Sequence, residues 1–534
     1  MFFTPVTASE IDEIILSLSD TKAYGLYSCP INFLKASKHV LSEHLAKLMN
    51  MSVQTGRYPA KLKISKICPI YKSEDDTDPS NYRPISLLSV FNKIFEKTMY
   101  TRLSSFIEKH ILLDIQYGFK KGHSTQHALL DIISTIQQNM DNKIYTCAVF
   151  IDLAKAFDTV HHSILLKKLY IYGVRGCVYD WFNSYLSERT QTTSINNYIS
   201  NKEGIRYGVP QGSILGPLLF LLFINDISAA SKVLKFHLFA DDTNILHSNK
   251  CLKTLEKEMN IELAKLQDWF ISNKLTINIK KSNFVLFHST RNKPKHVINI
   301  KILDHNNNRY IALEQKNYVK YLGILLDCTL SWKPHIEYLS KKVSRIVGIL
   351  SRLRHFLPKD ILIKMYKSLL QPLLTYGICT WGQASKKLIN KLLVLQKRAL
   401  RSIFFVSSTQ SAIPFFIENE ILPVKSLYFY SIAKLMHDVK YNNSPSNISK
   451  LFIHVRDIHS YETRSSTNDN YYSRFSRLNT QKDSFSRVGV RLWNQIPSAT
   501  RNLSKKKFQK KIKSIFLQDL NINRYDIEIS KLFK

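Results

Sequence analysis

Three aspartates stand out because each follows an apolar, strand-like run that would give it a rigid support. Asp152 comes directly after the run 149–151, and the adjacent Asp241 and Asp242 come directly after the run 238–240. Clustered carboxylates can hold two divalent cations about 3.5–4 Å apart, which activate a hydroxyl and stabilise a phosphoryl group during its transfer. Taken singly, Asp152 fits a helix N-cap equally well, and Asp241-Asp242 fits an ordinary polar turn. The chemical interpretation therefore depends on the surrounding sequence.

Hydrophobic periodicity predicts the elements that would position these aspartates. The run 145–153 is typical of a strand buried on both faces, and residues 236–246 predict two short strands that meet at a polar tip. The other predicted elements are helices over 9–50, 85–107, 162–186, 214–227 and about 251–273, and strands over 64–71, 276–287 and 318–326. This order predicts an α+β fold with helices on one face of an antiparallel sheet.

The charge of the chain indicates a polyanionic partner. Lys and Arg outnumber Asp and Glu by 76 to 41, and residues 331–534 alone contain 36 basic against 12 acidic residues. An excess of this size favours nucleic acid over a surface that is basic only for solubility. At 534 residues the chain is also too long for one ordinary core, and we expect about three or four domains.

The C-terminal part is predicted to be helical and basic. Helices are expected over 339–376 and 386–404, an Asn- and Ser-rich linker over about 440–490, and a last amphipathic helix that contains Phe508 and Phe516. The seven cysteines include no C-x-x-C pair, which excludes an obvious zinc finger or disulfide framework. Without a long apolar segment or a signal-peptide pattern, we expect an intracellular protein, in the nucleus or the cytoplasm, with no membrane partner.

A series of motifs around the aspartates resembles the reverse transcriptases of non-LTR retrotransposons in wording, order and spacing, most closely those of Jockey- and CR1-type elements. The motifs are Asn81–Leu88, Gly118–Thr125, Phe150–Asp158, Gly208–Pro217, Phe239–Asp242, Asn273–Leu275 with Asn278 and Lys281, and Tyr321–Gly323. The resemblance covers roughly residues 1–400. It implies an RNA-directed DNA polymerase with a right-hand architecture of fingers, palm and thumb.

The resemblance also implies an order of domains. They are an N-terminal helical extension (1–60), fingers (61–145 with part of 159–205), a palm with an antiparallel sheet (146–330), a helical thumb (331–405) and a basic C-terminal region (406–534). The resemblance implies that the proteins of whole elements of this type carry an N-terminal endonuclease before the polymerase. We find no pattern of that endonuclease in the sequence given. We therefore expect a truncated gene product, a fragment of a decayed element, or a polymerase that works apart from its nuclease.

The same resemblance assigns roles to individual residues. Asp152 and Asp241 are expected to chelate two Mg²⁺ ions, for which Mn²⁺ is the alternative, while Asp242 supports the site and the Leu153 carbonyl completes one coordination shell. The residues expected to bind the nucleotide are Arg83, Lys120, Phe157, Gln211, Gly212 and Lys281. The residues expected to contact primer or template are Tyr321, Leu322, Gly323, Trp332 and Lys333.

Two of these assignments have a structural alternative. Phe157 is expected to clash with a 2′ hydroxyl and so to select deoxynucleotides, but it also fits a core aromatic. Lys281 is expected to protonate the departing pyrophosphate, but with Lys280 beside it an ordinary surface lysine fits nearly as well.

The partners implied are an RNA template, a DNA primer, deoxynucleoside triphosphates and the element's own RNA in a ribonucleoprotein. Two other functions stay open from the sequence: a catalytically inactive nucleic-acid-binding remnant of such an element, and an RNA-templated RNA polymerase.

Overall fold

The structure, a computed structural model, describes most of the chain. The positions it leaves out are residues 20–24, 27, 28, 73, 74, 197, 305–308, 459, 460, 462–468, 474, 479–481, 524, 526, 530, 531 and 534. The fold is α+β, as predicted. Among the described residues, no helix is both long enough and apolar enough to cross a membrane.

A five-stranded sheet in the order β12-β9-β3-β8-β7 forms the centre of the molecule. The strands β9 (Asn283–Phe287), β3 (Tyr145–Ile151), β8 (Asp242–Asn249) and β7 (Lys235–Phe239) run antiparallel, whereas the short β12 (Glu314–Gln315) pairs in parallel with β9. All seven residues of β3 are buried, because this apolar strand has a neighbour on each side and packed helices above and below.

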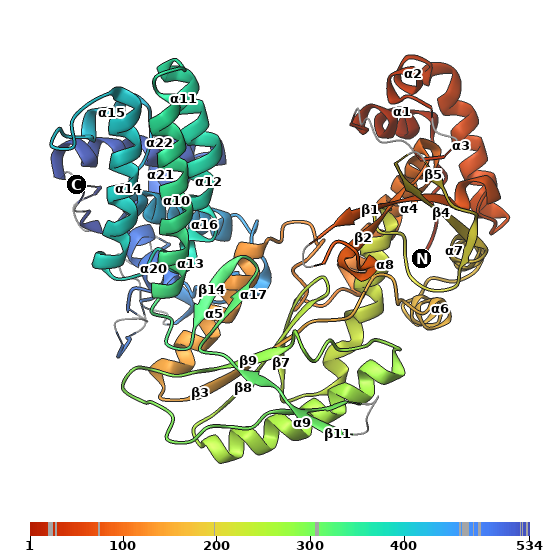
Figure 1. The fold of residues 1–534 in the computed structure, drawn as a ribbon, viewed down its shortest axis with the longest axis horizontal. Coiled ribbons are helices and arrows are strands. Elements are labelled where there is room, and N and C mark those ends of the chain that lie inside the picture. The colour runs from red at the N-terminus through yellow and green to blue at the C-terminus, as the bar shows by residue number, and fades with distance from the viewer. Residues whose placement is uncertain are drawn as a thin grey trace.

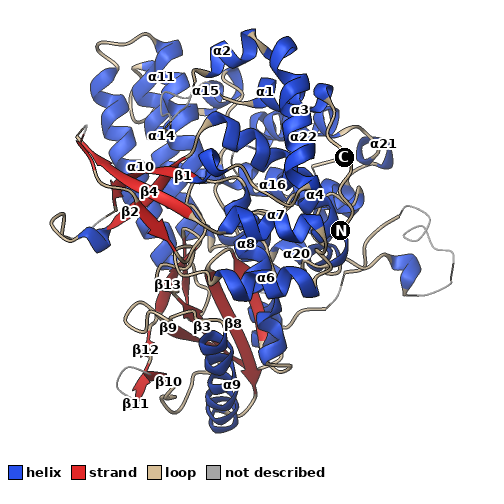
Figure 2. Ribbon diagram, turned by 90° about the vertical axis from the view of Figure 1, so that its right-hand side faces the viewer, coloured by secondary structure: helices blue, strands red, loops and turns tan. Residues whose placement is uncertain are grey.

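Helices cover both faces of the central sheet, so the prediction of helices on one face is wrong. Phe150 of β3 shares a core with α5 (Thr125–Asp141), whereas its neighbour Val149 shares a second core with α8 (Leu215–Ile224) and α9 (Leu252–Ser272). Successive residues of a strand point to opposite faces, and a strand that is apolar at every position needs cover on both. Figure 2 shows α9 standing against the strands of this sheet.

A second sheet contains the segment predicted to carry nucleotide-binding residues. Strand β1 (Ile64–Tyr71), which has its predicted bounds, pairs antiparallel with β2 (Tyr82–Leu87) and parallel with β4 (Arg189–Ile195). β4 also pairs with β5 (Tyr198–Ile199) and β6 (Glu203–Ile205). The helices in this half of the molecule are α1 (Ala8–Ser17), α2 (Ile31–Ala36), α3 (Lys38–Gln54), α4 (Val90–His110), α6 (His162–Ile171) and α7 (Cys177–Leu186).

The predicted helix over 162–186 is therefore two helices. Gly173 and Gly176, which lie between α6 and α7, have φ values of 92° and 61°. These left-handed conformations interrupt a helix and favour glycine.

The chain after the central sheet is mostly helical. The hairpin of β13 (Tyr318–Tyr321) and β14 (Ile324–Asp327) leads into this region. Its longer helices are α10 (Lys333–Leu353), α14 (Lys386–Phe404), α16 (Val424–Lys440), α20 (Phe485–Gln495) and α22 (Lys505–Asn523). Figure 1 shows these helices and α1–α3 rising on opposite sides of the central sheet.

The C-terminal region packs against the rest of the protein through a continuous core. Apolar residues of α5 and the central sheet belong to the same buried cluster as residues of α14, α16 and α22. The predicted linker over 440–490 is only partly described, and its described residues include the short helix α17 (Ser446–Ser449), which lies against α5. This part of the predicted linker is therefore an ordered connection.

Candidate active site

The predicted aspartates meet at one end of the central sheet. Strand β3 ends at Ile151, which pairs with Thr243 of β8, so that Asp152 comes level with Asp242 on the neighbouring strand. Opposed residues of antiparallel strands hold their Cβ atoms about 4.5–5.5 Å apart. Asp241 lies in the two-residue turn between β7 and β8. The register thus brings Asp152 together with the adjacent pair Asp241-Asp242, which lies in a distant part of the sequence.

The negative charges of Asp152, Asp241 and Asp242 repel one another and shift the pKa values of Asp241 and Asp242. Burial raises the pKa of Asp241, and Asp152 raises it further, whereas the positive charges of Arg83 and Lys72 lower it. Burial also raises the pKa of Asp242 to about 6, with contributions in the same direction from Asp241 and Asp152. Like charges held this close are unfavourable, and a bound cation would relieve the repulsion.

The set of oxygen donors fits hard divalent cations in an open site. Within the part of the chain that the structure describes, no group of three or more His, Cys, Asp or Glu side chains is arranged to hold a metal ion, the three aspartates included. Mg²⁺ does not need such a group, because it usually keeps several waters and binds one or two carboxylates together with substrate phosphates. The carboxylate pair on neighbouring strands therefore fits ions that arrive with a nucleotide better than a permanent structural metal.

The backbone at Asp152 is fixed by a loop that precedes β9. Asn278 donates its N–H to the Asp152 carbonyl at 2.8 Å, and Asp152 donates its N–H to Ser282 Oγ at 3.1 Å. The Ser282 hydroxyl in turn donates to the Asn278 carbonyl at 2.8 Å. Leu153, the predicted carbonyl ligand, follows within this bonded segment and its side chain is buried.

Sequence reasoning missed Ser282, because no spacing rule connects it to an aspartate 130 residues earlier. The strand predicted over 276–287 forms only from Asn283 onward.

The turn that carries Asp241 is held by residues 115–118. Ala240 adopts a left-handed φ of 56°, which is uncommon for a residue other than glycine. Gln116 Oε1 accepts hydrogen bonds from the Ala240 N–H at 3.0 Å and from the Gly118 N–H at 2.8 Å. A Cβ atom on Gly118 would lie 2.4 Å from the Ala240 nitrogen, so a side chain at this position would displace the turn.

Gln211 and Gly212 lie in the loop before α8, where three of the predicted motifs meet. The Gln211 amide donates to the two carboxylate oxygens of Asp158 at 2.9 and 3.0 Å, and the Gln211 carbonyl accepts from the Ser86 N–H at 2.6 Å. Burial raises the pKa of Asp158, whereas the hydrogen bonds from Gln211 lower it. Gly212 has a φ of 121°, and a Cβ there would lie 2.6 Å from the Ser86 carbonyl oxygen.

Phe157 is half-buried within an aromatic cluster. Its ring stacks on Phe220 of α8 with centroids 4.6 Å apart and meets the exposed Phe119 edge-on at 6.5 Å. Both predicted roles, contact with the sugar and packing in the core, fit this environment. The sugar-selecting role stays a prediction.

The predicted basic ligands fall into different places. Arg83 is exposed on β2 and acts electrostatically on Asp241, together with Lys72, which the sequence analysis missed. Lys120 instead forms an ion pair with Asp114 at 3.4 Å. Lys281 is exposed in the loop whose Ser282 binds the Asp152 backbone.

Leu322 and Gly323 form the tip of the β13–β14 hairpin, with φ values of 43° and 81°. The Tyr376 hydroxyl donates to the Leu322 carbonyl at 2.7 Å, and a Cβ on Gly323 would lie 3.2 Å from the Tyr376 ring. Tyr376 was absent from the predicted residues, although it holds this tip against the helical region.

Two predicted primer-contacting residues are buried. Tyr321 packs beside Phe150 with ring centroids 5.4 Å apart, and burial raises the pKa of its hydroxyl, with a further contribution from Asp242. Trp332 is only 2% exposed, and its backbone N–H donates to Asp327 Oδ1 at 2.8 Å at the start of α10. Burial of both side chains weighs against their direct contact with a primer at the surface, and the primer-contacting roles of Tyr321 and Trp332 stay predictions. Lys333 is exposed on the first turn of α10.

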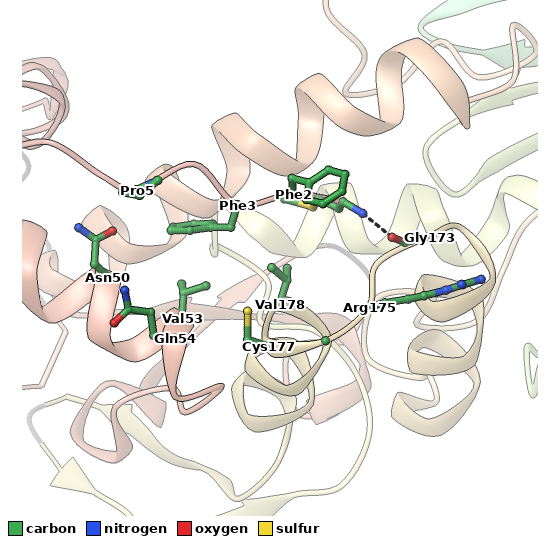
Figure 3. A pocket seen from close by; sticks show the side chains of 12 residues that line it. Phe2, Phe3, Pro5, Asn50, Val53, Gln54, Gly173, Arg175, Cys177 and Val178 are labelled. Carbon is green, nitrogen blue, oxygen red and sulfur yellow. Dashed lines mark hydrogen bonds between the residues drawn. The ribbon is translucent and has the colours of Figure 1, made fainter.

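A cavity of about 580 Å³ lies elsewhere, between the N-terminal segment and the start of α7. Figure 3 shows Phe2 and Phe3 on one side of it and Val53, Cys177 and Val178 on the other. None of the predicted site residues lines this cavity, and it has no part in the site described above.

The fold and the carboxylate site define the class of this protein. Residues 70–326, which include the three aspartates, match the family model for reverse transcriptase (RNA-dependent DNA polymerase). Residues 70–326 therefore form a reverse-transcriptase domain, and about three quarters of the chain is related to polymerases of non-LTR retrotransposons. This confirms the family resemblance predicted from the motifs.

Three relatives from Drosophila melanogaster illustrate the relationship. The chain is 32% identical over 423 residues to the probable RNA-directed DNA polymerase from transposon BS, covering 75% of this chain and 44% of the relative. It is 30% identical over 413 residues to the RNA-directed DNA polymerase from mobile element jockey (74% and 44%). It is also 30% identical over 423 residues to the probable RNA-directed DNA polymerase from transposon X-element (77% and 45%). The matched part is under half the length of each relative.

Proposed function

We propose that the chain extends a DNA primer on an RNA template, with deoxynucleoside triphosphates as substrates. The observation that carries the proposal is the meeting of Asp152, Asp241 and Asp242 at one end of the central sheet, within a reverse-transcriptase domain. Two Mg²⁺ ions bound there would activate the primer 3′ hydroxyl and neutralise the departing pyrophosphate. Asp152 and Asp241 are the proposed ligands, and Asp242 supports the site.

The other residues of the site are proposed to orient the substrates. Arg83 and Lys72 add positive charge beside Asp241, which suits the triphosphate of an incoming nucleotide. Gln211 is oriented by Asp158, and Gly212 lets the loop approach Ser86 closely, which would form a backbone surface for the nucleotide or the template base. The roles of Lys120 and Lys281 remain predictions with less support from their positions.

We also propose a right-hand arrangement of domains around this site. The central sheet serves as the palm, and residues 61–145 with part of 159–205, which include β1, β2 and β4, serve as fingers. The helices of 331–405 serve as the thumb and track the RNA–DNA duplex through its phosphates, which suits the basic surplus of 331–534. Lys333 and the hairpin tip at Leu322-Gly323 are placed near the primer in this arrangement.

Primer extension tests the polymerase proposal. The wild-type protein should extend a DNA primer on an RNA template when Mg²⁺ is present, and Asp241→Asn should abolish extension. Asp268→Asn, which changes an exposed aspartate of α9, is the matched control and should extend normally. Folded wild-type protein that binds the duplex in a salt-sensitive way but never extends it would contradict the proposal and favour a binding protein without catalysis.

Substitution of Phe157 tests whether this side chain selects deoxynucleotides over ribonucleotides. Phe157→Ala should increase the incorporation of ribonucleotides relative to deoxynucleotides in the same assay, since a smaller side chain leaves room for the 2′ hydroxyl. Phe220→Ala, which removes the stacked neighbour, controls for loss of packing. Discrimination that is unchanged in Phe157→Ala would assign Phe157 to the core alone.

A further inference from the structure

The C-terminal region touches the segment that holds the Asp241 turn. The side chains of Ser446 and Asn447, in the short helix α17, reach residues 114–117 from more than 300 positions away in the sequence. Ser446 Oγ donates to Asp114 Oδ2 at 2.5 Å. Asn447 Nδ2 donates to the Asp114 carbonyl at 3.1 Å and to the Tyr117 hydroxyl at 3.2 Å. Both residues lie outside the matched family segment 70–326.

The contacted segment runs beside β7 like an additional strand. The Tyr117 N–H donates to the Leu238 carbonyl at 2.8 Å, and the Leu238 N–H donates to the Ile115 carbonyl at 2.9 Å. Gln116, between them, accepts from the Ala240 N–H. Hydrogen bonds thus connect Asn447 to Tyr117, and Gln116, the neighbour of Tyr117 in the chain, to Ala240, the residue before Asp241.

A buried polar chain strengthens the same connection. The Tyr117 hydroxyl donates to Asp131 Oδ2 at 2.8 Å, and His237 Nδ1 of β7 lies 3.0 Å from the same oxygen. Tyr117, Asp131 and His237 are at most 5% exposed. Burial opposes ionisation of Asp131, but His237, Lys235 and Tyr117 together lower its pKa to about 2. An ionised carboxylate buried at this place fixes its partners firmly, because each would be costly to separate from it.

The C-terminal region also contacts the C-terminal end of α5, the helix that contains Asp131. Asp141, the last residue of α5, accepts hydrogen bonds from the backbone N–H groups of Arg477 at 3.0 Å and Leu478 at 2.8 Å. The C-terminal region therefore contacts both the segment beside β7 and the last residue of the helix that supports β7.

We propose that Asn447, assisted by Ser446, is a positioning residue for the Asp241–Asp242 turn, acting through Tyr117 and Gln116. The C-terminal region would thereby set the geometry of the metal-binding carboxylates without touching substrate. Small displacements of such groups cost large factors in rate, since catalysis depends on their preorganisation. The expected effect on rate rests on the proposed polymerase function, whereas the effect on the turn itself does not.

Hydrogen exchange of the turn tests the proposal without reference to activity. Asn447→Asp keeps the size of the side chain but removes both N–H donors, and it should speed the exchange of the Leu238 and Ala240 amides by about tenfold. Asn443→Ala, an exposed asparagine in the same region, is the matched control and should exchange as the wild type does. Tyr117→Phe, which removes the hydroxyl from the other side, gives a second variant should Asn447→Asp fold poorly.

Extension kinetics then separate positioning from general damage. In Asn447→Asp the turnover should fall by about tenfold and the Mg²⁺ concentration for half-maximal rate should rise, while the KM for the primer–template stays unchanged. Adding Asn447→Asp to Tyr117→Phe should cost less than Asn447→Asp costs alone, because both variants remove the Asn447–Tyr117 hydrogen bond, while Tyr117→Phe also removes the bond to Asp131. Wild-type exchange at Leu238 and Ala240 in both single variants would overturn the proposal. Wild-type protein that does not extend the primer would refute the polymerase function. The positioning role of Asn447 would then be decided by the hydrogen-exchange result alone.

Discussion

Replacing Asp242 with asparagine should stabilise the metal-free protein at neutral pH and at the same time lower primer extension. Burial and the charges of Asp241 and Asp152 raise the pKa of Asp242 to about 6 in the folded protein. The folded state therefore binds this proton more tightly than the unfolded state, so stability falls as pH rises from about 4 to about 6. Asparagine keeps the shape of the side chain and removes the charge that causes the loss.

The size of the effect follows from the pKa and the exposure of the side chain. A rise from the ordinary value of 3.8 to about 6 corresponds to about 3 kcal/mol in the free energy of unfolding. Asp242 is exposed by more than a third, so solvent screens part of the repulsion, and we expect about 1 kcal/mol. In a chain of this length that gain raises the melting temperature by about 1–2 °C.

Thermal unfolding in the presence of a chelator measures this gain. Asp242→Asn should melt above the wild type at about pH 7.5, and the difference should shrink toward pH 4 and disappear at about pH 3, where the carboxyl is protonated in both states. Adding Mg²⁺ should stabilise the wild type more than the variant, because ions bind the folded carboxylates. Asp268→Asn controls for loss of an exposed charge. A variant that melts below the wild type at about pH 7.5, or that gains as much at pH 4, would refute the reasoning.

Two further substitutions test the supports of the site. Gly118→Ala places a Cβ 2.4 Å from the Ala240 nitrogen and should lower both the free energy of unfolding, by about 1–3 kcal/mol, and the rate of primer extension. Gly204→Ala is the control, because its Cβ meets open space, and it should change the free energy of unfolding by under about 0.5 kcal/mol. Equal melting temperatures of the two variants would contradict the packing argument. Tyr376→Phe removes the hydrogen bond to the Leu322 carbonyl, which contributes about 1 kcal/mol. The variant should raise the KM for the primer–template about fivefold without changing the KM for the nucleotide. An unchanged KM for the primer–template would show that the hairpin tip does not contribute to primer binding.

Local pattern was enough to predict the strands that carry the aspartates and the aspartates themselves. The apolar run at β3 and the paired runs around Asp241 have the period and length of strands, and the abrupt change to carboxylates identified their ends. Helices with a strong apolar stripe, such as α9 and α14, were also predicted within a few residues. These features depend on neighbours in the sequence, so the sequence contains the information directly.

Predictions failed where a distant partner changed the local outcome. The helix predicted from residue 85 starts at Val90, because residues 85–87 pair with β1 and complete β2. The single strand predicted over 318–326 is a hairpin, since Leu322 and Gly323 take positive φ and the strands on either side pair with each other. In both segments a hydrogen-bonded partner outweighs the periodicity of the sequence.

The sequence by itself determined which strands end in carboxylates, and these carboxylates are the ones proposed to bind metal ions. Only the tertiary structure decided what holds those residues in place: Ser282 at the backbone of Asp152, Gln116 at the Asp241 turn, and Asn447 beyond it. It also decided that Trp332 is buried. Propensity and alternation act over a few residues, whereas these contacts join residues more than 100 positions apart and exist only once the helices and sheets have packed.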